Sequence, residues 1–527
     1  MHELELVLAL LVVVTALTPI ARRLRVPYPI LLVLAGLILA LLPAVPDIPL
    51  DPNLALLLFL PPLLYSASFS TSVRDFRGLL RPILSLAVGL VLVTTAVVAV
   101  VVNTLLPGIG WAAAFAFGAI VSPPDAVAAV AVFRGLGVPR RLVTLLEGES
   151  LVNDATALVT YRTAVAAMAV AFSVGEASVR FVVVGVGGVL VGLVVAVLVA
   201  ALRRRIEDPS VEIALTLLTP FAAYLPAEQL GLSGVLATVA AGLYLGWREP
   251  YITGSESRLG GRAVWQMVDF VLNGLVFILI GLQLSLILPA LAGHLLIPLI
   301  GIGLLVSLAM IVVRLAWIFG DSYLRWWLDR RKARAHGRPD TAPAPRRREN
   351  LVAGWAGMRG VVSLAAALAL PATTPERASL IFLTFLVILV TLVGQGLTLP
   401  LLIRALGVAQ DGNGPAQQEL RARRTVTEAA LARINQLAGQ WPTHLPLINA
   451  LRAQYEHRAS HLEDLPAEPE EENPADQELL EHHMIRRAVI DAERSAALHL
   501  RERGDIDDTI WRDIERELDL EELRMDA

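Results

Sequence analysis

The chain has 527 residues, of which 55% are hydrophobic and 17% are charged, with a net charge of −4 and a mean hydropathy of +0.63. This composition excludes an ordinary soluble globular protein. The sequence contains no cysteine, which excludes disulfides, thiol redox chemistry and thiolate metal sites.

Thirteen apolar runs are long enough, at about 20 residues, to cross a bilayer as helices. In chain order they cover 4–20, 28–44, 52–68, 82–106, 112–133, 142–166, 179–202, 211–226, 230–246, 265–287, 292–320, 350–370 and 379–405. Spans 8 and 9 have the least distinct limits, because only a short turn separates them. The first five residues hold no Lys or Arg and so lack a basic n-region, and we expect span 1 to be a retained anchor and not a cleaved signal peptide.

Arginines are concentrated in alternate connections between these spans. They follow spans 1, 3, 5, 7, 9 and 11, at Arg22, Arg23, Arg25, Arg74, Arg77, Arg81, Arg134, Arg140, Arg141, Arg203 to Arg205, Arg248, Arg258, Arg262 and the loop from Arg325 to Arg348. The other connections are nearly free of cations, apart from Arg180 and Arg377. The positive-inside rule therefore predicts an external N-terminus and a cytoplasmic C-terminus, in agreement with an odd number of spans.

The composition becomes charged after about Gly407. Residues 408–527 hold 26 Asp and Glu against 14 Arg. We therefore divide the chain into a transmembrane domain, 1–407, and a cytoplasmic tail, 408–527. In the tail we expect helices near 416–438, 446–460, 476–502 and 506–524, and an acidic linker at Glu463–Asp476. The length and charge of the tail suggest a regulatory role.

Two side-chain patterns within the tail could carry a function. His482 and His483 could sense pH or bind a metal, but two solvated histidines on a charged helix are the simpler interpretation. Further along, Trp511, Ile514, Leu518 and Leu523 predict an amphipathic helix that packs against another element.

Two spans carry residues that should interrupt a helix. Span 5 contains Ser122-Pro123-Pro124-Asp125, and prolines in mid-span remove backbone donors and clash with the preceding turn. Span 12 contains three glycines in 354–360, which could unwind the helix in the same way. Irregular backbone at membrane depth persists only where protein buries it or where it lines a cavity. Two broken helices in corresponding halves of a chain indicate a transporter built from inverted repeats.

Span 6 carries polar residues that folding alone does not require. Glu149, Ser150, Asn153 and Asp154 fall within one arc of about 140° on a helix. An ionisable group at the bilayer centre costs about 2.5–3.5 kcal/mol on insertion scales, so cation or proton handling is the default interpretation. Together with Asp125 these residues offer hard oxygen ligands, which suit a small hard cation. Arg314 in span 11 needs a carboxylate partner if it lies within the bundle.

These motifs resemble those of bacterial sodium/proton antiporters of the cation:proton antiporter-1 family, of the NhaP and NHE type. The resemblance rests on Gly148 to Asp154, Ser122 to Val127, Val313 to Trp317 and Gly357 to Gly360, and it extends over about residues 5–407. It implies an all-α homodimer of thirteen-helix subunits in the bacterial plasma membrane, with roles in pH and sodium homeostasis. Spans 4–6 and 11–13 would form a mobile core, and the remaining spans a rigid interface domain.

The resemblance also implies roles for the site residues. Asp154 would bind cation and proton alternately, with Na⁺ held at Asp125, Ser150 and Asp154. Glu149 would help to coordinate the ion or to hold the site. Arg314 would pair with Glu149 and Asn153, and Arg359 would stabilise the crossing of the broken helices. The family often has threonine immediately before the first aspartate, where this chain has Pro124, so one hydroxyl ligand is missing.

The expected mechanism is competition at Asp154. An aspartate partly removed from water can hold a proton or a cation, but hardly both, and Asn153 adds no charge beside it. We therefore expect exchange of one monovalent cation, Na⁺ first and Li⁺ or K⁺ as alternatives, for one proton, without a cofactor and without net charge movement.

Other interpretations remain open at this stage. Asp154 could form a buried ion pair with Arg162 or Arg314 that only fixes helix packing. Gly231-Leu232-Ser233-Gly234 matches the motif of an intramembrane serine protease, but no histidine falls within a predicted span to act as its base. A channel, or a sensor that transports nothing, are further alternatives. We expect Glu212, Glu228 and Asp269 to lie at membrane interfaces, because they fall near predicted span ends.

Overall fold

The computed structural model describes residues 2–24, 26–42, 51–133, 136–169, 173–291, 296–335, 346–408, 413–464, 474–503, 514 and 517–521. It divides into two compact units, Met1–Ala409 and Gln410–Ala527. Every regular element in these ranges is helical, which confirms the all-α prediction.

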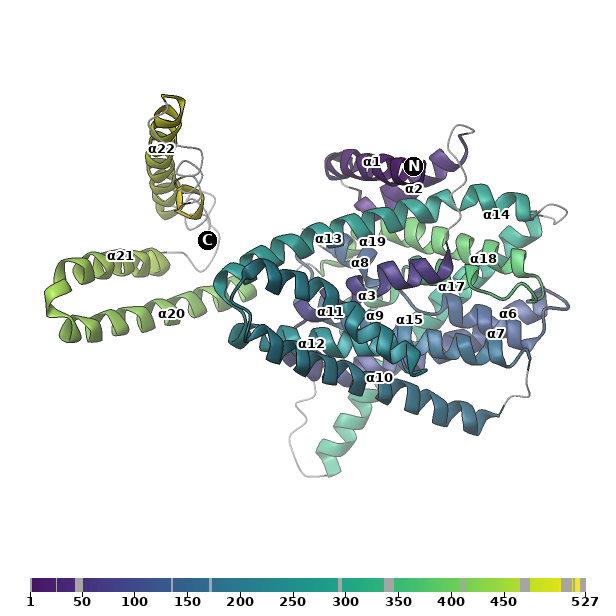
Figure 1. Ribbon diagram of the computed structural model, residues 1–527. Helices are drawn as coiled ribbons and strands as arrows, with labels where there is room; N and C mark the ends of the chain where they lie inside the picture. The colour runs from purple at the N-terminus through teal and green to yellow at the C-terminus, as the bar shows by residue number, and fades with distance from the viewer. Residues whose placement is uncertain are drawn as a thin grey trace. The chain divides into compact units, whose positions relative to one another are not determined.

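Figure 1 shows the helices of the first unit, which run almost without interruption along the chain. They are α1 (His2–Leu24), α2 (Tyr28–Ala40), α3 (Pro52–Ser70), α4 (Val73–Gly78), α5 (Leu80–Leu84), the π-helix η1 (Ser85–Leu90), α6 (Val91–Leu105), α7 (Trp111–Val121), α8 (Ala126–Phe133), α9 (Arg140–Ala166), α10 (Val174–Arg203), α11 (Pro209–Gln229), α12 (Gly234–Ile252), α13 (Ser255–Leu282), α14 (Leu284–Ala290), α15 (Leu296–Ala335), α16 (Arg347–Trp355), α17 (Val361–Leu368), α18 (Arg377–Leu389), the π-helix η2 (Val390–Gln395) and α19 (Gly396–Leu406).

Each predicted span overlaps a helix or a run of consecutive helices. By length and composition, seven of the described helical segments could cross a membrane, and three shorter apolar helices lie near the N-terminus. The count of thirteen crossings stays a prediction. The helix α9 is not among the seven, because its charged and polar residues lower its mean hydropathy. Neighbouring helices bury much of α9, including the polar residues Glu149, Asn153 and Asp154.

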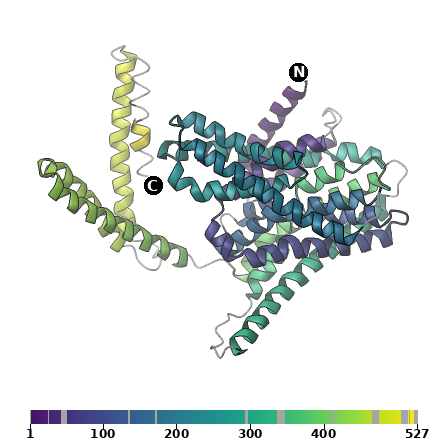
Figure 2. The same cartoon turned by 60° about the horizontal axis from the view of Figure 1, so that its bottom comes forward.

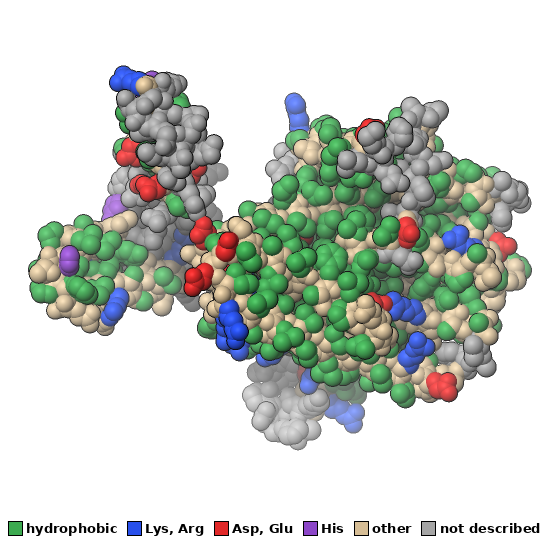
Figure 3. All heavy atoms as spheres, in the orientation of Figure 1, with side chains coloured by type: hydrophobic (Ala, Val, Ile, Leu, Met, Phe, Trp, Pro, Cys, Tyr) green, Lys and Arg blue, Asp and Glu red, His purple; other side chains and the backbone are tan. Residues whose placement is uncertain are grey.

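The apolar surface of the first unit is consistent with a lipid environment. Hydrophobic side chains cover most of the face seen in Figure 3. The outer side of α10 contributes exposed valines and leucines, namely Val179, Val182, Val183, Val186, Leu190, Val194, Val197 and Leu198. Figures 1 and 2 also show the C-terminal end of α15 extending beyond the bundle. At 40 residues and 1.5 Å per residue, α15 is about twice as long as a bilayer requires.

The helices of the first unit pack in two groups. The helices α6, α7, α9, α15, α16, α17 and α18 contact one another, and α1, α2, α3, α10, α11, α12 and α13 form the second group. The groups meet where α3 and α13 contact α17 and where α12 contacts α9. In the second group, α2 and α13 cross closely at Gly36 and Gly281, where an added Cβ would lie 2.3 Å from a backbone oxygen of the other helix. Small residues permit such close crossings in membrane bundles.

The second unit contains α20 (Asn413–Gln440), the short helix η3 (Pro442–His444), α21 (Leu445–Asp464) and α22 (Pro474–Glu502). These match the first three helices predicted for the tail. Most of the predicted linker at 463–476 lies outside the described residues, as do Trp511, Leu523 and the side chains of His482 and His483. Residues 517–521 are helical, Leu518 is buried, and Asp519 accepts a hydrogen bond of 2.7 Å from Arg494 of α22.

Candidate functional site

The predicted break in span 5 separates α7 from α8. Residues 122–125 leave the helical conformation at the two prolines. The backbone N–H of Asp125 donates to the carbonyl of Met358 at 2.6 Å, which ties this break to the one in span 12. Within the turn, Asp125 Oδ1 accepts from the N–H of Val127 at 2.8 Å. The two broken helices therefore meet through their irregular segments.

The break in span 12 separates α16 from α17 at residues 356–360. Arg359 is 2% exposed, and its guanidinium donates to the carbonyls of Val121 at 3.0 Å, Ser122 at 3.3 Å and Gly357. Val121 ends α7, so the arginine supplies hydrogen bonds and positive charge at the C-terminus of that helix, where carbonyls lack partners. This geometry accords with the stabilising role that the resemblance implies for Arg359.

Gly360 is required by the close approach of Asp125. A Cβ at Gly360 would lie 2.0 Å from Asp125 Oδ2, far inside any permitted contact. The glycine therefore allows the carboxylate to lie directly against the second broken helix.

An ion pair that is closed to water links α9 to α15 through Glu149 and Arg314. Glu149 is 1% exposed and Arg314 is 2% exposed. Arg314 donates to both carboxylate oxygens of Glu149, at 2.5 and 2.8 Å, and to the carbonyl of Ala353 at 3.2 Å. Such bidentate pairs fix geometry as well as charge. Glu149 thus holds helices together and does not line the cavity described below.

Asn153 has a different partner from the one expected. The predicted pairing with Arg314 is wrong, because the Asn153 amide nitrogen donates to the carbonyl of Pro124 at 2.8 Å and its buried amide oxygen accepts no hydrogen bond from the residues that the structure describes. Proline lacks an N–H but keeps a strong carbonyl acceptor. Asn153 therefore anchors the break of span 5 to α9 at the position where the family often has threonine.

Asp125, Ser150 and Asp154 line one cavity of about 960 Å³ between the two helix groups. Asp154 is 8% exposed, and Ser150 Oγ accepts from the N–H of Ala126 at 3.3 Å. The two arginines considered as partners of Asp154 pair elsewhere, since Arg162 binds Glu228 at 2.7 Å and Arg314 binds Glu149. A purely structural ion pair with either arginine is therefore not its role.

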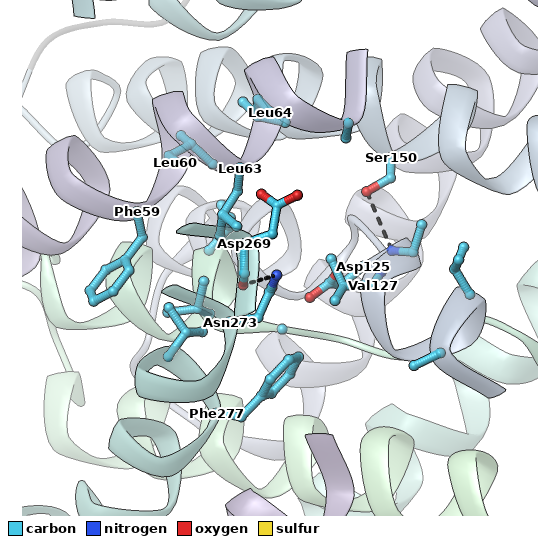
Figure 4. A pocket seen from close by; sticks show the side chains of 18 of the residues that line it. Phe59, Leu60, Leu63, Leu64, Asp125, Val127, Ser150, Asp269, Asn273 and Phe277 are labelled. Carbon is cyan, nitrogen blue, oxygen red and sulfur yellow. Dashed lines mark hydrogen bonds between the residues drawn. The ribbon is translucent and has the colours of Figure 1, made fainter. Parts of the chain in front are cut away.

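The cavity also contains polar residues that sequence reasoning missed. Figure 4 shows Asp269 and Asn273 of α13 lining the pocket across from Asp125 and Ser150. Asp269 lies near the middle of α13, which begins at Ser255, and its place at a membrane interface stays a prediction. Glu147 on α9 lines the cavity as well. A carboxylate within the apolar run 265–287 was the sequence signal that could have identified Asp269.

The other two carboxylates assigned to interfaces have structural partners. Glu212 pairs with Arg203 at 2.9 Å in a buried position. Glu228 accepts from Arg162 and from the N–H of Gly234 at 3.1 Å. Ser233, the serine of the protease-like motif, caps α12 by accepting from the N–H of Leu236 at 3.2 Å. Its hydroxyl thus has an ordinary helix-capping role.

A family model described as "Sodium/hydrogen exchanger, transmembrane" matches residues 8–405. The chain belongs to this family. One relative is the "Uncharacterized Na(+)/H(+) exchanger Rv2287" of Mycobacterium tuberculosis H37Rv. It is 36% identical to this chain, over 99% of this chain and 96% of its own length. YjcE of Escherichia coli K12, described in the same words, is 32% identical over 98% of this chain and 96% of its own length.

Two further relatives extend the comparison. A "Sodium, potassium, lithium and rubidium/H(+) antiporter" of Bacillus subtilis 168 is 30% identical over 96% of this chain and 75% of its own length. The solved structure of the sodium proton antiporter MjNhaP1 from Methanocaldococcus jannaschii at pH 8 superposes with a TM-score of 0.58 at 20% identity, over 77% of this chain and 99% of that chain. This superposition shows that the exchanger shares the antiporter fold.

Proposed function

We propose that this membrane protein exchanges Na⁺ for H⁺, and that Asp154 binds the two ions in turn. The observation that carries the proposal is the shared cavity, in which Asp125, Ser150 and Asp154 lie at the crossing of two broken helices. Membership of the sodium/hydrogen exchanger family supports cation:proton exchange.

The oxygen atoms that line the cavity are suited to bind a monovalent cation that has lost part of its hydration shell. Two carboxylates and a hydroxyl are hard oxygen ligands, which small hard cations prefer. A cation and a proton neutralise the same buried charge on Asp154, so binding of one excludes the other. Na⁺ at Asp125, Ser150 and Asp154 is the proposed loaded state, and it uses no hydroxyl at position 124, where the Pro124 carbonyl is already bonded to Asn153.

Alternating access follows from the two helix groups. In this proposal the group built on spans 4–6 and 11–13 moves against the other group and carries the site from one side to the other. The packed pair of Glu149 and Arg314 and the hydrogen bonds of Arg359 support rigid movement, because they lie within one group. We further propose a homodimer in the bacterial plasma membrane, with the N-terminus outside and the tail, 408–527, in the cytoplasm as a regulatory domain.

The test is cation-driven proton movement in proteoliposomes with an internal pH dye, comparing wild type with Asp154→Asn. We expect Na⁺ to drive proton movement in the wild type and the response to vanish in the variant. Li⁺ and K⁺ are measured beside Na⁺, since the Bacillus subtilis relative is named for several cations. Equal responses in both proteins would remove Asp154 from the mechanism and favour a channel or a sensor.

The stoichiometry is tested in the same liposomes. We propose electroneutral exchange of one cation for one proton, since Asp154 is the single carboxylate that takes up the proton when the cation leaves. An imposed potential contributes about 2.3 kcal/mol per charge per 100 mV, so electrogenic exchange would respond strongly. A marked shift in rate with potential contradicts the one-for-one version.

A further inference from the structure

A second cavity, of about 920 Å³, lies between α3, α11, α12 and α13. Four arginines line it: Arg74, Arg77, Arg203 and Arg262. All four belong to connections or span ends that the charge pattern assigns to the cytoplasmic side. We call this cavity the vestibule.

The vestibule meets the cavity of the proposed ion site at a narrow set of residues. The residues that line both cavities are Ser66, Ser70, Gln266 and Asp269, and we call them the neck. All four neck side chains are polar, although the cavity of the proposed ion site is otherwise lined largely by apolar residues. A polar neck between the vestibule and the site is suited to the passage of a hydrated or partly hydrated ion.

Asp269 is the one charged residue among the neck residues. Ser66 on α3 donates to Asp269 Oδ2 at 2.5 Å, which fixes the carboxylate between two helices of the same group. One turn further along α13, the Asn273 amide donates to the Asp269 carbonyl at 2.8 Å, and Asn273 lines the site cavity. In Figure 4 the side chains of Asp269 and Asp125 line the same pocket from different elements.

The positive charge of the vestibule suggests a role for the carboxylate of Asp269. The four arginines outnumber the two other carboxylates of the vestibule, Glu212 and Glu249, and this excess of positive charge opposes the approach of cations. Arg203 forms a buried pair with Glu212. Clefts lined by one sign of charge change the local concentration of ions and hence their rate of arrival. A carboxylate at the neck offsets this field where a cation leaves the vestibule.

We propose that Asp269, oriented by Ser66, is a relay carboxylate that receives the cation between the vestibule and the site of Asp125 and Asp154. This inference rests on the proposed exchange function and adds a residue that acts before the site is loaded. Asp269 attracts the cation and passes it on, whereas Asp154 exchanges it for the proton. Its loss therefore affects the concentration of cation that is needed and not the exchange step.

The decisive variant is Asp269→Asn, which keeps the shape of the side chain and an acceptor for Ser66 but removes the charge. In proteoliposomes loaded so that Na⁺ enters from the vestibule side, we expect the apparent KM for Na⁺ to rise about tenfold, the lower end of the effect of a charged cleft. The maximal rate should stay within about twofold of wild type, as for a change in binding alone. Asp269→Glu should restore most of the affinity.

The matched control is Asp75→Asn, which removes an exposed carboxylate beside Arg74 that does not line the vestibule. It should leave the KM unchanged. A wild-type KM in Asp269→Asn overturns the relay. Loss of transport at every Na⁺ concentration in a variant that melts like wild type also overturns it, because Asp269 would then act in the exchange step. If the wild type does not exchange ions at all, the proposed function fails instead.

A second measurement uses the absence of native cysteine. Ser70→Cys at the neck can be modified after folding with a cationic or an anionic methanethiosulfonate reagent. The cationic adduct should slow Na⁺ transport at low Na⁺ far more than the anionic adduct. Ser255→Cys, exposed at the start of α13 and outside both cavities, is the control. Equal effects of the two adducts at position 70 contradict an electrostatic relay.

Discussion

The two sides of α9 place their carboxylates in opposite environments. Glu149 lies on the packed side, where Arg314 binds both of its oxygens and water is excluded. Asp154, five residues further on, lies on the cavity side with Ser150 and Asp125. The helix α9 thus carries one carboxylate, Glu149, that is paired within the protein, and one, Asp154, that can bind an ion from solution.

This difference separates residues that stabilise the fold from residues that take part in transport. A buried ion pair that loses one member leaves an uncompensated charge, so Glu149 and Arg314 should act on stability. A carboxylate that lines a cavity can exchange its partner, so Asp154 should act on transport. The predictions below test this division.

Removing the arginine should have the largest effect on the fold. For Arg314→Ala we expect a loss of about 3–5 kcal/mol of stability, because Glu149 would remain buried and charged. Melting temperature in detergent measures it. The double change Arg314→Met with Glu149→Leu keeps volume without charge and should recover most of the loss. A single variant as stable as wild type would show that water reaches Glu149.

Gly360→Ala should act on the cavity side with less effect on stability. The added Cβ would collide with Asp125 Oδ2 and displace this carboxylate from the cavity. We expect a fall in Na⁺-driven transport of about tenfold or more, equivalent to ~1.4 kcal/mol. Gly394→Ala is the control, because its Cβ would meet nothing within 4 Å. Equal transport by both variants would mean that the position of Asp125 does not matter.

The smallest effect is expected near the C-terminal end of α9. Arg162 pairs with Glu228, but their side chains are 48% and 24% exposed. Exposed pairs contribute about 0–1 kcal/mol, so Arg162→Ala should change the melting temperature little and leave transport near wild type. A large loss of transport in Arg162→Ala would contradict this prediction and would indicate that Arg162 acts on Asp154.

The local sequence was sufficient to predict the helix breaks in spans 5 and 12 and the arc of polar residues on α9. Two adjacent prolines must interrupt a helix, and the glycines of 354–360 permit the second break, so both appear where predicted. The helical period likewise placed Glu149, Ser150, Asn153 and Asp154 on neighbouring positions of α9. It could not separate Glu149 from Asp154, because both fall within the same arc and only the neighbours of each differ.

The partners of these residues depended on contacts between distant parts of the chain. Asn153 binds Pro124 of the broken turn and not Arg314, whose guanidinium binds Glu149. Asp269 of α13 lines the cavity beside α3, whose Ser66 donates a hydrogen bond to its carboxylate. In each case the deciding distance joins helices that are far apart in sequence.

The sequence by itself determined a helical membrane protein of the sodium/hydrogen exchanger family, two interrupted helices and the carboxylates near them. These follow from hydropathy, backbone chemistry and motifs, all of which are local along the chain. Only the tertiary structure decided which carboxylate is paired, which ones share a cavity, and that Asp269 joins this cavity to an arginine-lined vestibule. Burial and charge pairing depend on packing across the bundle, and no local pattern contains that information.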